Sequence, residues 1–158
     1  MNTSWTSAIQ WQAPRQDWQD RSVLAFSVPV GHGAAVPPNV TLSRDERRAP
    51  QDPPGEAFEP YVKRQLAQLA QVLPQLTIVR HGELQGSAYP VREAVLRWQA
   101  GERLLCQWVV WLAMPDGTVL NFTATAANDH FEAVRPDFET ALRQLQIRPE
   151  QLPAPKGA

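Results

Sequence analysis

The sequence has few of the features that mark secreted, membrane or nucleic-acid-binding proteins. It contains one cysteine, Cys106, among 158 residues, which excludes an intramolecular disulfide framework. Its longest apolar run, residues 104–114, is much shorter than the ~20 residues that a membrane-spanning helix needs. Acidic and basic residues nearly balance, with a formal net charge of −1, so neither nucleic acid nor an anionic membrane is an expected partner.

The N-terminus also lacks the basic and apolar regions of a secretory signal. We therefore expect a soluble, cytoplasmic protein without stable membrane insertion. The length suits one domain with a sizeable buried core. Prolines cluster in residues 37–38, 49–54 and the C-terminal tail, which predicts loops and an unstructured end. The expected division is an N-terminal extension at 1–16 with room for a short strand, a single domain at 17–147, and a Pro-rich flexible tail at 148–158.

The spacing of apolar residues predicts an α+β fold. Alternation in residues 22–28 and 40–43 indicates two strands, and spacing of three and four residues over 56–73 indicates an amphipathic helix. Pro136 suggests that a second helix, with Asp129 as its N-cap, either kinks or begins later. The remaining elements are strands at 76–84, 89–99, 103–113 and 118–126, followed by that helix at 129–145. Together they form a curved antiparallel β-sheet packed with two main helices.

Strand 103–113 is apolar on both faces, and Gln107 lies among its apolar residues. A buried amide without partners costs about 1–3 kcal/mol. One interpretation is a central strand covered by helices or by a dimer partner, with Gln107 bonded to backbone. The other is an apolar concave surface that receives a hydrophobic ligand, with Gln107 as one of its few polar contacts.

No set of side chains converges on catalysis. His81 and Glu83 would share a strand face and could form half of a metal site, but the sequence places no third ligand beside them. His32 lies in a Gly-His-Gly loop too short for phosphate binding, and His130 only follows a predicted helix cap. We therefore expect a protein that is not an enzyme and that uses no cofactor or metal.

Four segments, in their order and spacing, resemble the DcrB-like family. They are WQDRSVLAFSVP, NVTLSRD, FEPYVKRQLAQLAQVLP and RLLCQWVV. Within that family they are most similar to the Eag (effector-associated gene) chaperones of bacterial type VI secretion. The resemblance covers about residues 17–147 and implies a DcrB/Mog1-like sandwich.

The resemblance implies a homodimeric, cytoplasmic, non-enzymatic chaperone. Its partner would be a PAAR-containing toxin effector, such as an Rhs protein, whose N-terminal transmembrane helices are shielded in a hydrophobic groove before export. The family's groove positions correspond here to Val23, Ala25, Gln65, Leu73 and Gln107. The apolar face of strand 103–113 adds Leu105, Val109 and Trp111 as candidates for binding the client helix.

Ala25 departs from the family pattern, in which a larger aliphatic residue is expected. The two glutamines would hydrogen-bond to the client helix, as polar side chains do between helices in membranes. The alternative function is a general protein- or lipid-binding module of the same DcrB/Mog1-like architecture, without a transmembrane client.

Overall fold

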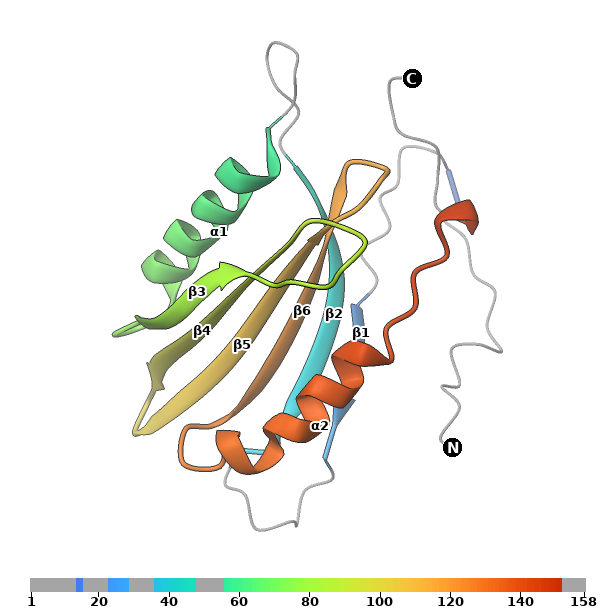
Figure 1. The fold of residues 1–158 in the computed structure, drawn as a ribbon. Helices are drawn as coiled ribbons and strands as arrows, with labels where there is room; N and C mark the ends of the chain where they lie inside the picture. The colour runs from blue at the N-terminus through green and yellow to red at the C-terminus, as the bar shows by residue number, and fades with distance from the viewer. Residues whose placement is uncertain (1–13, 16–22, 29–35, 48–55, 152–158) are drawn as a thin grey trace.

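The computed structural model describes residues 14–15, 23–28, 36–47 and 56–151. In these residues six strands form one antiparallel sheet, on which two helices pack, and this confirms the predicted α+β architecture (Figure 1). The elements are β1 (Val23–Ser27), β2 (Asn39–Glu46), α1 (Phe58–Val72), β3 (Thr77–Glu83), β4 (Val91–Ala100), β5 (Arg103–Ala113), β6 (Thr118–Ala127), α2 (Phe131–Arg143) and the short 3₁₀ helix η2 (Pro149–Gln151).

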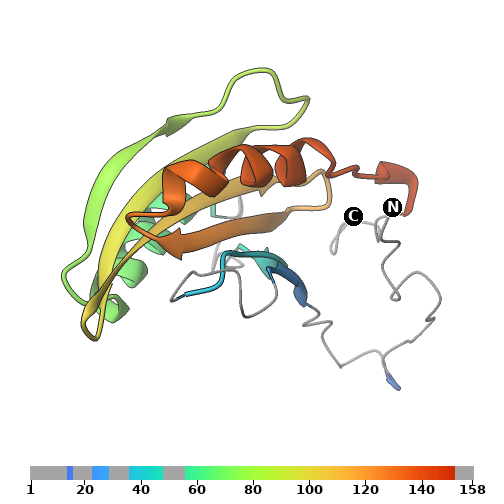
Figure 2. The ribbon, with the colours of Figure 1, turned by 90° about the horizontal axis from the view of Figure 1, so that it is seen from below.

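The strand order in the sheet is β1-β2-β6-β5-β4-β3. The two helices pack on opposite faces of this sheet, each over its own hydrophobic core. β3 to β6 form the predicted meander, and the β1–β2 pair extends it at β6. The chain must cross one face to travel from β2 to the far edge at β3, and α1 makes this crossing. α2 follows β6 and packs on the other face, in front of the sheet in Figure 1. Figure 2 shows the strong bend of the strands.

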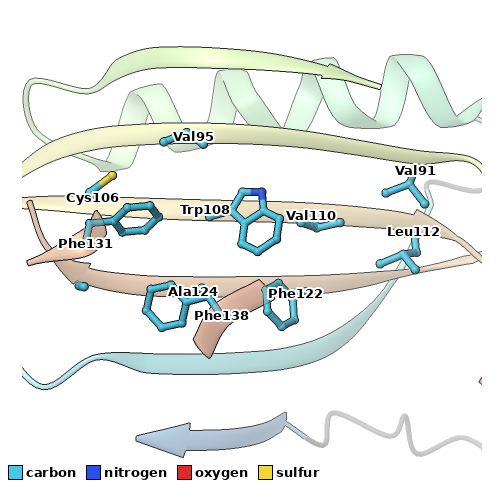
Figure 3. Close-up of a cluster of buried hydrophobic side chains, with 11 residues drawn as sticks. Val91, Val95, Cys106, Trp108, Val110, Leu112, Phe122, Ala124, Phe131 and Phe138 are labelled. Atoms are coloured by element: carbon cyan, nitrogen blue, oxygen red, sulfur yellow. The ribbon is translucent and has the colours of Figure 1, made fainter. Parts of the chain in front are cut away.

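The core on the α2 side is built from aromatic and aliphatic side chains. Trp108 of β5 meets Phe122 of β6 edge to face, with ring centroids 5.6 Å apart (Figure 3). Phe131 and Phe138 of α2 close this core from above the sheet. Cys106 is buried here as a free thiol, as its place in the apolar run predicts.

The core on the α1 side is held mainly by the first two turns of α1. Tyr61 and Val62 are buried there against side chains of β4, β5 and β6. Two polar contacts fix the helix in place. The Tyr61 hydroxyl donates to Asp45 of β2 at 2.9 Å, and Arg92 of β4 donates to Glu59 of α1 at 2.8 Å. Strand β5 is therefore a central strand between two helices, one of the two interpretations that the sequence left open.

The ends of α2 differ from the expectation. The N-cap is His130 rather than Asp129, and no side chain caps the helix. Pro136 lies inside the helix, which begins at Phe131, so the alternative of a start after Pro136 is wrong. Pro136 is the sixth residue of the helix, beyond the first turn, and it lacks the N–H that would otherwise donate to the carbonyl of Glu132. Of the predicted tail, residues 149–151 form η2.

Candidate functional site

The first-strand candidates face the same side of the sheet as α1. Directly paired residues of neighbouring strands project to the same side. Ala25 pairs with Thr41, Thr41 with Thr123, and Thr123 with Val109, whose side chain packs under α1. Val23 reaches Trp111 through the equivalent row of Ser43 and Asn121. Val23 is 57% exposed and Ala25 is also exposed, so both form an open rim opposite α1.

The two helix candidates, Gln65 and Leu73, belong to α1. Gln65 is half-buried, and its Nε2 lies 3.5 Å from the Asp45 carboxylate, which places this side chain over β2. The same carboxylate accepts the Tyr61 hydroxyl. Burial and the neighbouring Asp45 raise the pKa of Tyr61 well above its ordinary value, so this phenol stays protonated and remains a donor. Leu73 is the half-buried C-cap residue of α1.

Gln107 has a hydrogen-bond partner within the chain, and that partner is a side chain rather than the expected backbone. Its Nε2 donates to Thr125 Oγ1 at 3.2 Å, and the two residues are directly paired across β5 and β6. Gln107 is half-buried, and no residue in the described ranges donates a hydrogen bond to its side-chain carbonyl oxygen. The amide is therefore tolerated next to the core because a neighbouring threonine satisfies one donor.

The three apolar candidates of β5 are buried. Val109 and Trp111 belong to the core beneath α1, with exposures of 5% and 2%. Leu105 is also buried, near the other end of the strand. The expectation of an open apolar face along β5 is therefore wrong for the folded chain, because all three side chains are buried and α1 covers Val109 and Trp111. Contact of these three residues with a client helix remains a prediction, and for Val109 and Trp111 it requires α1 to move.

The open part of this side is lined by small polar side chains. We call it the α1-side surface and define it as Val23, Ala25, Thr41, Ser43, Asn121, Thr123, Gln107, Gln65 and Leu73. Its floor is half-buried hydroxyls and amides of β2, β5 and β6, and its apolar groups lie on the rims. The pairing of β2 with β6 makes Asn121 and Thr123 part of this floor, and that pairing cannot be read from strand alternation.

Other candidate chemistry is weak. Among the residues that the structure describes, no group of three or more His, Cys, Asp or Glu side chains could hold a metal ion. Glu83, half of the predicted pair with His81, lies 3.6 Å from Arg92 in an ion pair. His130 caps α2, and His32 lies outside the described residues. In the described part of the chain, no helix has the length and apolar character to cross a bilayer.

A separate hollow lies on the other face, between α2 and the β1–β2 pair. This cavity of about 600 Å³ is largely apolar. Its lining includes Leu24, Phe26, Val40, Val134, Phe138 and Ala141. We call it the α2-side groove. Nothing in the sequence pattern singled it out, because the packing of α2 beside β1 is a tertiary feature.

The fold and its residues match one known family. The sequence profile of DcrB matches residues 11–144, which is most of the chain. The chain belongs to the DcrB family. Among solved structures, the PA94 protein of Pseudomonas aeruginosa resembles this DcrB-family chain with a TM-score of 0.71 and 25% sequence identity. The similarity covers 85% of this chain and 88% of that protein.

Two more distant structures resemble this DcrB-family protein weakly. They are CyanoP, the cyanobacterial PsbP of Synechocystis sp. PCC 6803, and LpqN, involved in cell envelope biogenesis of Mycobacterium tuberculosis. Each gives a TM-score of 0.48 and 14% identity over 80% of this chain, covering 82% and 80% of the respective proteins, values too low to bear on function. No curated protein sequence matches the chain at a significant level.

Proposed function

We propose that this DcrB-family protein is a chaperone of type VI secretion effectors. It would bind and shield the N-terminal transmembrane helices of a PAAR-containing toxin, such as an Rhs protein, in the cytoplasm before export. The bound helix would lie on the α1-side surface, between α1 and β1. Self-association into a homodimer is part of the proposal, and neither a catalytic step nor a cofactor is involved.

One observation carries the proposal. Residues that are far apart in the sequence, and that the family resemblance marks as groove positions, border one surface. Val23 and Ala25 of β1 form one rim, Gln65 lies on the opposite wall, and Gln107 belongs to the floor. A shared binding surface requires these side chains to face the same side of the sheet, and they do.

The chemistry of this surface suits a membrane-seeking helix. Helices in membranes associate through small residues that allow close approach and through occasional polar bridges worth about 0.6–2 kcal/mol each. Thr41, Ser43 and Thr123 are small and carry hydroxyls, and the carbonyl oxygen of Gln107 is available to accept. This floor can therefore contact many apolar helices without requiring one sequence.

Hydrophobic burial would supply most of the affinity. Each Leu, Val or Phe of the client that leaves water contributes roughly 1.5–3 kcal/mol. Half a dozen such residues offset an association cost on the order of 4–15 kcal/mol. In this proposal, the exposed Val23 and the half-buried Leu73 would supply apolar contacts to the client from β1 and α1.

The test is co-expression of the tagged chain with the effector encoded beside it, with and without the effector's N-terminal apolar segment. Co-purification should require that segment. Leu73→Asp should abolish it, because a charge on the wall would be buried against an apolar helix. Gln107→Ala should weaken it several-fold. Light scattering of the purified chain tests the homodimer.

The matched control is Gln144→Ala, which removes the same side chain from the C-terminal end of α2, on the other side of the sheet. It should leave co-purification unchanged. Capture that persists without the apolar segment, or that survives Leu73→Asp in a folded protein, would contradict the proposal.

The second candidate is a general protein- or lipid-binding module of the DcrB/Mog1-like type. The α2-side groove favours it, because an apolar cavity of about 600 Å³ has the size of an ordinary ligand pocket. Mass spectrometry of organic extracts from the purified chain separates the two. A stoichiometric small ligand, together with no binding of any transmembrane segment, would favour the module.

A further inference from the structure

The α2-side groove leaves large apolar side chains open to solvent. Phe26 and Leu24 of β1 are 64% and 46% exposed, and both point to the α2 side through their pairing with Val40 and Leu42. Across the cavity lie Val134, Phe138 and Ala141 of α2, in a lining that carries one charged side chain, Asp137. A continuous apolar hollow of this kind on a folded chain marks a place that another segment covers.

The two edges of the sheet differ in how they are protected. β3 carries a register shift between Ile78 and Arg80 and charged side chains at Arg80 and Glu83, features that prevent another strand from pairing with an edge. β1 is five residues of Val-Leu-Ala-Phe-Ser without a charge, a proline or a bulge, and in the described residues it pairs only with β2. The outer edge of β1 therefore lacks the features that would prevent another strand from pairing with it.

We infer that residues 5–11 of the same chain add a strand to the free edge of β1 and cover the α2-side groove. These residues lie outside the described part of the structure, and their sequence is WTSAIQW. Trp5, Ile9 and Trp11 share one set of alternate positions with Ser7, and the intervening side chains are Thr6, Ala8 and Gln10. This period of two is typical of a strand with one large apolar face and one small or polar face.

The chain connection allows this arrangement. The first described residue of β1 is Val23, and the chain bends at Pro14 and Arg15, between the segment and the strand. Eleven residues separate Trp11 from Val23, enough for the chain to reverse and lie antiparallel to β1. A short tether gives an effective concentration in the millimolar range, so the contact can form inside one molecule with modest intrinsic affinity.

Charge also favours this occupant. Residues 1–13 contain no Asp, Glu, Lys or Arg, so placing them beside an apolar groove buries no side-chain charge. The added strand would direct Trp5, Ile9 and Trp11 to the side of Leu24 and Phe26. It would at the same time give the free N–H and C=O groups of β1 their missing partners. The inference is independent of the client, because the α1-side surface is on the opposite face.

The test is disulfide trapping in the full-length chain. Neighbouring residues on paired strands have Cα atoms about 4.5–5.5 Å apart, a distance that a disulfide spans. Ile9→Cys combined with Phe26→Cys, or with Leu24→Cys, should form an intramolecular disulfide under mild oxidation. Cys106 does not compete, because it is buried and burial raises the pKa of its thiol. The matched control is Gln10→Cys with Phe26→Cys, which places the two thiols on opposite faces.

The outcomes separate the possible occupants. A monomeric disulfide with Ile9→Cys that exceeds the Gln10→Cys control several-fold supports the inference. A covalent dimer would show that a second copy fills the edge, and no disulfide in either combination would show that the segment lies elsewhere; both overturn it. As a second measurement, Trp5→Ser with Trp11→Ser should raise the binding of a hydrophobic fluorescent dye several-fold. Unchanged dye binding would also overturn the inference.

Discussion

Trp111→Ala and Gln107→Ala form a matched pair that tests whether α1 covers the sheet in solution. Both residues lie on the same face of β5, four positions apart, but Trp111 is 2% exposed beneath α1 whereas Gln107 is half-buried beside it. Burying an aromatic side chain removes about 150–250 Å² from water, and truncating a buried tryptophan to alanine costs about 3–5 kcal/mol. Loss of the hydrogen bond from Gln107 to Thr125 should cost only about 1 kcal/mol.

Thermal unfolding followed by far-ultraviolet circular dichroism measures both losses without relying on tryptophan emission. A change of 1 kcal/mol shifts the melting temperature by about 2–4 °C for a chain of this length. Trp111→Ala should therefore lower it by roughly 10 °C and Gln107→Ala by about 3 °C. Equal, small losses for the two variants would refute the argument that α1 shields Trp111 and would restore the open apolar face that the sequence suggested.

Three further results are expected. The free energy of unfolding should not depend on Tyr61 ionisation below about pH 10 and should fall above it, because burial and Asp45 raise the pKa of Tyr61 in the folded state while the unfolded phenol ionises at its ordinary value of 10.0. In urea titrations at several pH values, Tyr61→Phe should flatten that part of the pH profile. An unchanged slope would exclude the effect. Cys106 should react slowly with a thiol reagent at pH 8 and rapidly in denaturant, since burial raises the pKa of its thiol; equal rates would show that the α2-side core opens readily. Glu59→Gln should cost less than about 1 kcal/mol, with a smaller loss at high salt, because Glu59 and Arg92 are 51% and 30% exposed, and a salt-independent loss would point to a role in packing.

Local sequence patterns predicted most of the fold. The alternation in the strands and the helical spacing in 56–73 placed all six strands and both helices within a few residues. The misplaced α2 cap shows the limit of this approach. Asp129 is a favoured cap type, but the chain enters the helix one residue later.

The candidate site was harder to predict, because it depends on which segments meet. Alternation shows that Trp111 and Gln107 share a face, but it does not show that α1 crosses over one and stops short of the other. The floor of the α1-side surface requires the pairing of β2 with β6, a contact between strands separated by the whole meander. Pairing places Val23, Ala25 and Gln107 on the same side of the sheet, and binding of a client helix by the residues that the family resemblance marks stays a prediction.

The uneven attachment of α1 has a mechanical consequence. Its buried residues, Tyr61 and Val62, and its contacts with Asp45 and Arg92 belong to the first two turns. Leu66 and Leu69 further along are only partly buried, and Val72 in the last turn is 70% exposed. Segments with few buried contacts open at low free-energy cost. Small rotations of α1 about its N-terminal turns would therefore move its C-terminal end away from the sheet. Such a movement would widen the α1-side surface there and let it accept client helices of different diameter.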